Sequence, residues 1–142
     1  MPRSGKTDHH LGMRTERAVG LAVLAAVVVG CSGSAVVSSS TRGTLSPMQF
    51  DVAGTPIPQI QWGMPGQLKV VQWGSSSCPA VVKTITSTDA HRLTIHTRTD
   101  CDGPGTADLA PVISTVAAPA KLDDRADAQA RIDGVSVVLG HR

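Results

Sequence analysis

From Gln49 onward the chain is divided into short apolar segments, and this pattern restricts its fold more than any other feature. The segments are rich in Val, Ile and Thr and are separated by Gly, Pro and Asp, as is typical of β-strands joined by tight turns. Their spacing predicts an all-β fold, a small antiparallel β-sandwich of the immunoglobulin-like or a similar kind. The expected strands are residues 49–52, 59–62, 67–73, 80–86, 92–99, 112–117, 127–132 and 135–139.

Residues 122–131 are the one segment whose composition also suits a helix. They are rich in Ala, Asp and Arg, yet Leu122 is their only large apolar residue. A helix there would lack the apolar stripe by which helices dock. A solvent-exposed helical turn and a loop leading into the strand near Ile132 both remain open.

An uncharged apolar run, residues 18–30, follows two arginines and ends at Cys31. A basic flank, a short apolar core and a small residue before the cut are the three parts of an export signal. The run is too short to cross a bilayer, which takes about 20 apolar residues. We therefore expect residues 1–30 to be a signal peptide with a helical core, beginning at Met1 or at Met13.

The end of this run, Val28-Val29-Gly30-Cys31, resembles the lipobox of bacterial lipoproteins, although Val28 stands where that family usually has Leu. The resemblance implies cleavage between Gly30 and Cys31 and a diacylglyceryl group on the Cys31 thiol. Two or more acyl chains, such as palmitate, anchor a protein stably. The resemblance thus implies a lipid-anchored protein on the extracytoplasmic face of the cell membrane. An ordinary secretory signal followed by an unrelated cysteine is the alternative.

Residues 31–47 are rich in Ser, Gly and Thr, a composition typical of flexible linkers. We expect a tether here and the folded domain at residues 48–142, although the Val36-Val37 pair could instead begin an edge strand. From residue 31 onward the chain carries nine basic and nine acidic residues. This balance gives no polybasic surface, so no nucleic-acid partner is expected.

Cys78 and Cys101 are the cysteines that remain if Cys31 carries lipid. An even pair in an oxidising compartment predicts a disulfide. Between them the sequence is typical of a hairpin, and a turn centred between Asp89 and Ala90 places the two cysteines opposite each other. Metal binding by the two thiols is the alternative, but further ligands at suitable spacing are lacking.

The same register predicts which side of the hairpin is buried, because residues two apart share a face. Cys78 and Cys101 have the parity of the more apolar face, so we expect the disulfide to face the core. We expect it to contribute ~3 kcal/mol to the free energy of unfolding through chain entropy. That face holds Val82, Thr84, Thr86, Leu93, Ile95 and Thr97.

The run from Trp73 to Pro79, Trp-Gly-Ser-Ser-Ser-Cys-Pro, precedes the hairpin, and Ala107-Asp-Leu-Ala-Pro111 follows it. Over residues 67–139 this pattern is similar to a group of uncharacterised exported lipoproteins of actinobacteria. The resemblance implies the same architecture and compartment, and it implies no activity.

Two tetrapeptides, Ile60-Gln-Trp-Gly63 and Val71-Gln-Trp-Gly74, recur eleven residues apart. We expect their tryptophans, Trp62 and Trp73, to fill the core or to line one edge of it. A ligand platform built from both rings is the alternative.

Side chains that could carry catalysis or bind a metal lack the spacing that such chemistry needs. The serines at 75–77 do not form the Gly-x-Ser-x-Gly elbow of a hydrolase, and residues 100–103 lack the remaining acids of a calcium loop. His91 and His96 fall on opposite faces of a strand, and His9-His10 is given no metal role. We expect no catalytic residue, no metal and no cofactor.

The expected role is a binding or structural module of the cell envelope, with the membrane as partner through the lipid on Cys31. An accessory factor for another envelope protein, acting in secretion or signalling, is the alternative. A small secreted hydrolase is the third possibility. The ligand and the oligomeric state stay open.

Overall fold

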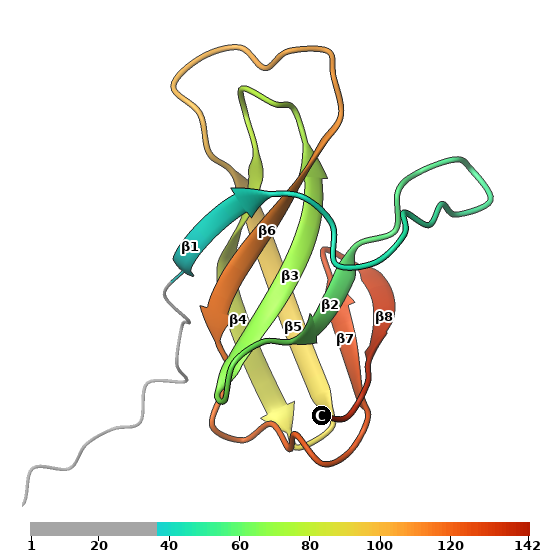
Figure 1. Cartoon of the computed structure of the whole chain (residues 1–142), viewed down its shortest axis with the longest axis vertical. Helices are drawn as coiled ribbons and strands as arrows, with labels where there is room; N and C mark the ends of the chain where they lie inside the picture. The colour runs from blue at the N-terminus through green and yellow to red at the C-terminus, as the bar shows by residue number, and fades with distance from the viewer. Residues whose placement is uncertain (1–36) are drawn as a thin grey trace, which may run out of the picture.

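Eight β-strands and no helix make up residues 37–142, the part of the chain that the computed structural model describes (Figure 1). The all-β prediction is confirmed, and residues 122–127 form a loop that leads into a strand beginning at Ala128. Accordingly, none of these residues belongs to a helix that could cross a membrane. The strands are β1 (Val37–Arg42), β2 (Gln59–Trp62), β3 (Gln67–Gly74), β4 (Ala80–Asp89), β5 (Arg92–Thr99), β6 (Ala110–Ala117), β7 (Ala128–Ile132) and β8 (Val135–Leu139).

Residues 1–36 lie outside the described residues. The predicted start at Met1 or Met13, the signal peptide, the cleavage site after Gly30 and the lipidated Cys31 all fall within them. These expectations stay predictions.

The strands form two four-stranded sheets packed face to face. Their order is β1-β6-β3-β2 in the first sheet and β4-β5-β7-β8 in the second. Figure 1 shows the first sheet in front of the second. Every pair of neighbouring strands is antiparallel except β5 and β7, which are parallel. The predicted sandwich is therefore confirmed, with this one parallel pair as its departure from a purely antiparallel arrangement.

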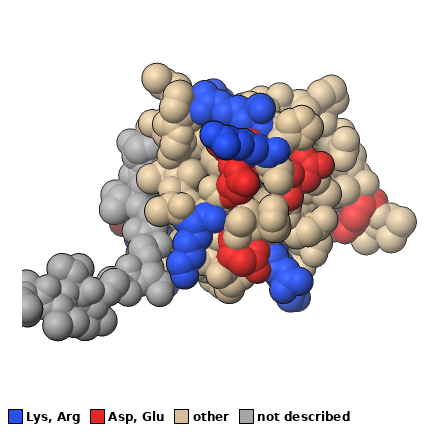
Figure 2. Space-filling model, turned by 90° about the horizontal axis from the view of Figure 1, so that it is seen from below, with Lys and Arg blue, Asp and Glu red and all other residues tan. Residues whose placement is uncertain are grey.

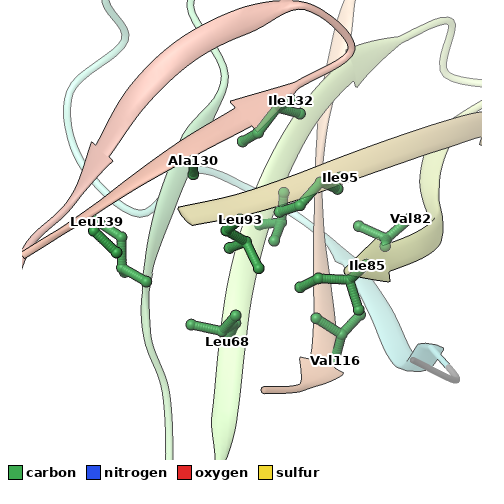
Figure 3. Close-up of a cluster of buried hydrophobic side chains, with 11 residues drawn as sticks. Leu68, Val82, Ile85, Leu93, Ile95, Val116, Ala130, Ile132 and Leu139 are labelled. Atoms are coloured by element: carbon green, nitrogen blue, oxygen red, sulfur yellow. The ribbon is translucent and has the colours of Figure 1, made fainter. Parts of the chain in front are cut away.

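The core lies between the sheets, where alternate residues of each strand point inward. In β7, for example, Ala130 and Ile132 are buried and the residues beside them are exposed. Figure 3 shows Val116 of the first sheet close to Ile85 of the second. The buried cluster consists of Leu68, Val70, Val82, Ile85, Leu93, Ile95, Val116, Ala128, Ala130, Ile132 and Leu139.

Strand β1 corrects the prediction of a flexible tether over the whole of residues 31–47. It pairs with β6 as an edge strand, which was the alternative. From Gly43 the chain then crosses the outer face of the first sheet toward the β2 edge (Figure 1). The Gly43 N–H donates to the Pro111 carbonyl at 3.2 Å and fixes the beginning of this crossing. We call residues 43–47 the strap.

Residues 49–52, predicted as a strand, belong instead to a projecting loop. Their one strand-like pairing is an isolated bridge at Phe50. Asp51 bends the chain, because its Oδ1 accepts hydrogen bonds from the backbone N–H groups two and four residues further on, at 2.9 and 2.8 Å. Such local bonds from a side chain favour turns over strands. We call residues 48–56 the apolar loop.

The β4–β5 hairpin keeps the predicted register only near the disulfide. A bulge at Lys83 shifts the next pairs by one residue, so that Ile85 opposes Ile95, and a second irregularity at Thr88 shifts the last pair, Asp89 with Arg92, once more. An extra residue turns the side chains that follow it to the other face. Ile85 is therefore buried in the core and Thr86 is exposed, which is the reverse of the predicted faces.

Candidate functional site

Cys78 and Cys101 are joined in a disulfide, as predicted, with Cα atoms 4.7 Å apart. Cys78 is buried, whereas Cys101 is exposed, so the bridge lies at the rim of the core rather than inside it. The Gly103 carbonyl oxygen lies 3.3 Å from each sulfur. Because bridged sulfurs carry no proton, this is a polar contact and not a hydrogen bond.

The Ser75–Ser77 run, considered above as a nucleophile, forms a hydrogen-bond network between two loops. The Thr106 N–H lies 2.9 Å from both Ser75 Oγ and Ser77 Oγ. The Ser76 N–H donates to Asp108 Oδ1 at 3.2 Å, and the Thr106 hydroxyl donates to the same carboxylate. These bonds tie the two loops together beside the disulfide, which is a structural use of the serines.

Asp108 is the acid whose chemistry this network changes. The hydrogen bond from the Thr106 hydroxyl, and then those from Ser76, favour the charged carboxylate and lower the pKa of Asp108 to about 2. A carboxylate with so low a pKa is a weak proton acceptor. The arrangement therefore suits a structural anion better than a general base.

The histidines of the described chain lie elsewhere. His91 is at the tip of the β4–β5 turn, at the opposite end of the hairpin from the disulfide. His96 Nδ1 is 3.8 Å from Asp133, and His141 Nδ1 is 3.0 Å from Asp127; the hydrogen bond from His141 lowers the pKa of Asp127. Residues 37–142 contain no group of three His, Cys, Asp or Glu side chains placed to hold a metal.

Trp62 and Trp73 lie on opposite faces of the first sheet. Trp62 pairs with Leu68 and packs against the core, as expected. Trp73 is five residues from Leu68 in the same strand and therefore points to the outer face, where it pairs with Pro111. The two rings do not form one ligand platform.

An uncharged groove of about 360 Å³ lies where the β2 edge of the first sheet meets the β8 edge of the second. Its size falls within the range of ligand sites, roughly 300–1,000 Å³. We call it the edge groove. Its lining consists of Ser46, Gln49, Ile57, Pro58, Gln59, Ile60, Ser136, Val137 and Val138.

Gln59 fixes the rim of the edge groove. Its Oε1 accepts hydrogen bonds from the N–H groups of Leu45 at 2.9 Å and Ser46 at 3.3 Å. Its Nε2 donates to the carbonyls of Ser46 at 3.1 Å and Pro47 at 3.2 Å. One side chain thus fastens the strap to β2. An amide in a short strand gives no signal in the sequence that would have identified this role.

The apolar loop projects from the same side of the sandwich (Figure 1). Its side chains Met48, Phe50 and Val52 are exposed, as is Val138 in the groove lining. Exposed large apolar side chains that gather beside a groove are typical of protein-contact surfaces. The alternating pattern of residues 49–52 predicts a strand, so it gives no signal of this exposed surface.

Strand β8 is an edge strand with outward-facing backbone groups. The Gln129 N–H of β7 donates toward β5, so the alternate residues of β7 bond to β8 instead. Those alternate residues pair with Val137 and Leu139. The N–H and C=O groups of Ser136 and Val138 therefore point away from β7, and β8 is the last described strand of its sheet.

The other three edges carry features that oppose pairing with a further strand. Strands β1 and β4 contain bulges, and one of the extra residues in β4 is Lys83. Strand β2 has only four residues and directly follows Pro58. Strand β8 has no bulge, no charge and no proline. Of the four edges in the described chain, β8 is the one best suited to accept an additional strand.

Comparisons of the chain with protein-family models, with curated proteins and with solved structures find no match. The similarity of the run from Trp73 to Pro79 to exported lipoproteins therefore stays a prediction. The sandwich architecture by itself assigns no function, because unrelated functions share it.

Proposed function

We propose that this chain is a lipid-anchored protein of the extracytoplasmic face whose role is to bind an extended segment of another envelope protein along β8. The observation that carries the proposal is the open β8 edge beside the edge groove. An extended peptide that adds to such an edge gains main-chain hydrogen bonds, and pockets beside the edge select its side chains. The outward groups of Ser136 and Val138 would bond to it.

Two features support the compartment. The run that ends in Gly30-Cys31 resembles a lipobox, and acyl chains on Cys31 would hold the protein at a membrane. The Cys78–Cys101 disulfide is of the kind that persists outside the reducing cytosol.

The edge groove and the apolar loop support a protein ligand over a charged small molecule. No charged side chain lines the groove, so burying a charged ligand group there would cost solvation without compensation. Every second side chain of an added strand would point toward the groove, where Ser46, Gln49 and Ser136 offer hydrogen bonds to uncharged polar groups. Phe50 and Val138, both more than half exposed, would bury apolar surface against the same partner.

Photo-cross-linking in cells tests the proposed surface. A benzoylphenylalanine placed at Val138 or at Phe50 is expected to give one and the same covalent adduct with an envelope protein. The same group at Lys83, on the opposite edge of the second sheet, is expected to give none. Adducts that form equally at all three positions, or at none, would contradict the proposal.

A pair of proline substitutions shows whether the β8 backbone takes part in binding the partner. Ser136→Pro removes an N–H that points outward, so it should abolish the adduct from Phe50 while leaving the unfolding temperature nearly unchanged. Val137→Pro removes an N–H that bonds to β7 and should destabilise the fold. If the Phe50 adduct survives Ser136→Pro, strand addition at β8 is wrong. Val138→Lys, which adds a charge to the edge, provides a second variant with the same expected loss of the adduct.

Anchoring is tested separately through Cys31→Ser. This change is expected to leave the signal peptide uncleaved, so that the product keeps the precursor mass and carries no lipid. Membrane association and mature mass that are both unaffected by the substitution would refute lipidation.

A further inference from the structure

We infer that the sandwich rests against the lipid bilayer with the end that carries Met64, an inference that relies on the proposed lipidation of Cys31. Five residues, 32–36, separate Cys31 from β1. The six residue steps between the two Cα atoms span at most ~20 Å. The tether expected over residues 31–47 would have reached ~55 Å. Because β1 belongs to the sheet, the domain is held much closer to the membrane than the sequence suggests.

The chain enters the sandwich at one particular end. Val37 pairs with Val116, the next-to-last residue of β6. At the same level, Gln67 at the beginning of β3 pairs with Ala117. Strand β1 therefore begins level with the first residues of β3, with β6 between them. We call the end of the sandwich that carries the β2–β3 turn the turn end; this turn lies at the bottom of Figure 1.

Met64 is an exposed apolar side chain at the turn end, with 69% of its surface accessible. Its carbonyl accepts a hydrogen bond from the Gln67 N–H at 2.9 Å, which closes a tight turn around Pro65 and Gly66. Gly66 has a φ of 74°, a conformation that this turn type requires and that glycine adopts without strain. The turn lies two strands from β1, a lateral distance of ~10 Å, so a lipid on Cys31 can hold Met64 at the bilayer surface.

Charge does not explain such a contact. Figure 2 views the molecule from the turn end, and basic and acidic side chains are interspersed over it. Lys121 and Arg125, for example, lie in the same connection as Asp123 and Asp124. Mixed charges at this spacing give little net attraction to anionic lipid. The contact is therefore expected to depend on the short segment between Cys31 and β1 and on the apolar side chain of Met64.

The opposite end of the sandwich is kept away from the bilayer. Strand β3 alone extends ~24 Å from Gln67 to Gly74. The two loops beside the disulfide, which contain Ser75 and Thr106, continue beyond it. The apolar loop is also in the upper half of Figure 1. In this orientation β8 runs roughly perpendicular to the membrane plane, and a partner can reach its edge from the side.

Depth-dependent quenching tests the orientation with the mature lipidated protein purified from membranes. The protein is reconstituted into phosphatidylcholine vesicles whose lipids carry a nitroxide quencher. A fluorophore on Met64→Cys is expected to be quenched several-fold more than one on Leu109→Cys or Val52→Cys. Leu109 is a matched control, because it is an exposed apolar residue next to the start of β6 at the far end.

The outcomes separate this inference from the proposed function. Equal quenching at the three positions, or the strongest quenching at Val52, would overturn the orientation. So would quenching of the Met64 label that appears only when anionic lipid is added, because charge would then make the contact. Purified protein whose mass shows no lipid on Cys31 refutes the proposed anchoring, whereas lipidated protein with an unquenched Met64 label refutes the orientation alone.

Discussion

Gln59 shows how one side chain can shape a candidate binding surface. Its four hydrogen bonds hold the strap against β2, and a hydrogen bond contributes about 1 kcal/mol net. Because the four share one side chain, we expect Gln59→Ala to lower the free energy of unfolding by about 1–2 kcal/mol. Gln61→Ala, an exposed position two residues along the same face, should change it by less than about 0.5 kcal/mol. Urea unfolding measures both, and equal losses would contradict this role of Gln59.

Asp108 predicts a pH dependence that is confined to acid conditions. The hydrogen bonds from Thr106 and Ser76 lower its pKa from 3.8 to about 2, so folding favours the charged carboxylate. Its contribution to stability is complete above about pH 4 and is lost as the pH falls through about 2. We expect Asp108→Asn to unfold at lower urea concentration than the natural protein at pH 7, with a difference that shrinks toward pH 2.

Asp102→Asn is the control for this experiment, because it removes a charge from the same loop without removing those hydrogen bonds. A difference between Asp108→Asn and the natural protein that stays constant between pH 7 and pH 2 would show that the carboxylate charge is not the cause.

At the scale of single elements, the bulge in β4 decides which residues are core. Ile85 is fully buried, and Thr86 is exposed. Ile85→Ala is therefore expected to cost about 2–5 kcal/mol of unfolding free energy, the usual range for a buried isoleucine. Thr86→Ala should stay within about 0.5 kcal/mol of the natural protein. A hairpin without the bulge predicts the larger loss at position 86, so denaturant unfolding of the two variants decides the register.

The elements that the sequence predicts well are those fixed by local pattern. Strands β2, β5 and β8 have the expected bounds, because alternation and turn residues specify them without help from distant parts of the chain. The bridge between Cys78 and Cys101 follows from the same local hairpin.

The elements that the sequence does not predict depend on long-range pairing or on single side chains. Strand β1 consists mostly of Ser and Thr and is held by β6, about 70 residues later, so its local signal is weak. Asp51 converts an apolar run into a turn. The edge groove brings Gln59 beside Val138, which only the topology of both sheets determines.

At the scale of the whole molecule, the four sheet edges differ in whether a further strand can pair with them. A sandwich leaves two open edges on each side, and proteins block such edges to avoid unwanted pairing. On the β1 and β4 side both strands are bulged, and the Arg42 guanidinium at the end of β1 donates at 3.1 Å to the Ser76 carbonyl in the loop that leads to β4. On the β2 and β8 side one edge is left open beside a groove. This asymmetry predicts that assembly with a partner occurs on one side only.

Hydrogen exchange over the whole molecule tests that asymmetry. Amides of the central strands β3, β5, β6 and β7 should exchange slowest, because they are bonded on both sides and buried. Along β8 we expect an alternation, with slow exchange at Val137 and Leu139 and fast exchange at Ser136 and Val138. The alternation should be the same at low and high protein concentration. If a second copy paired with β8, Ser136 and Val138 would exchange slowly at high concentration and faster on dilution. Slow exchange at both residues at every concentration would show that β8 is already paired, which would remove the basis for strand addition by a partner.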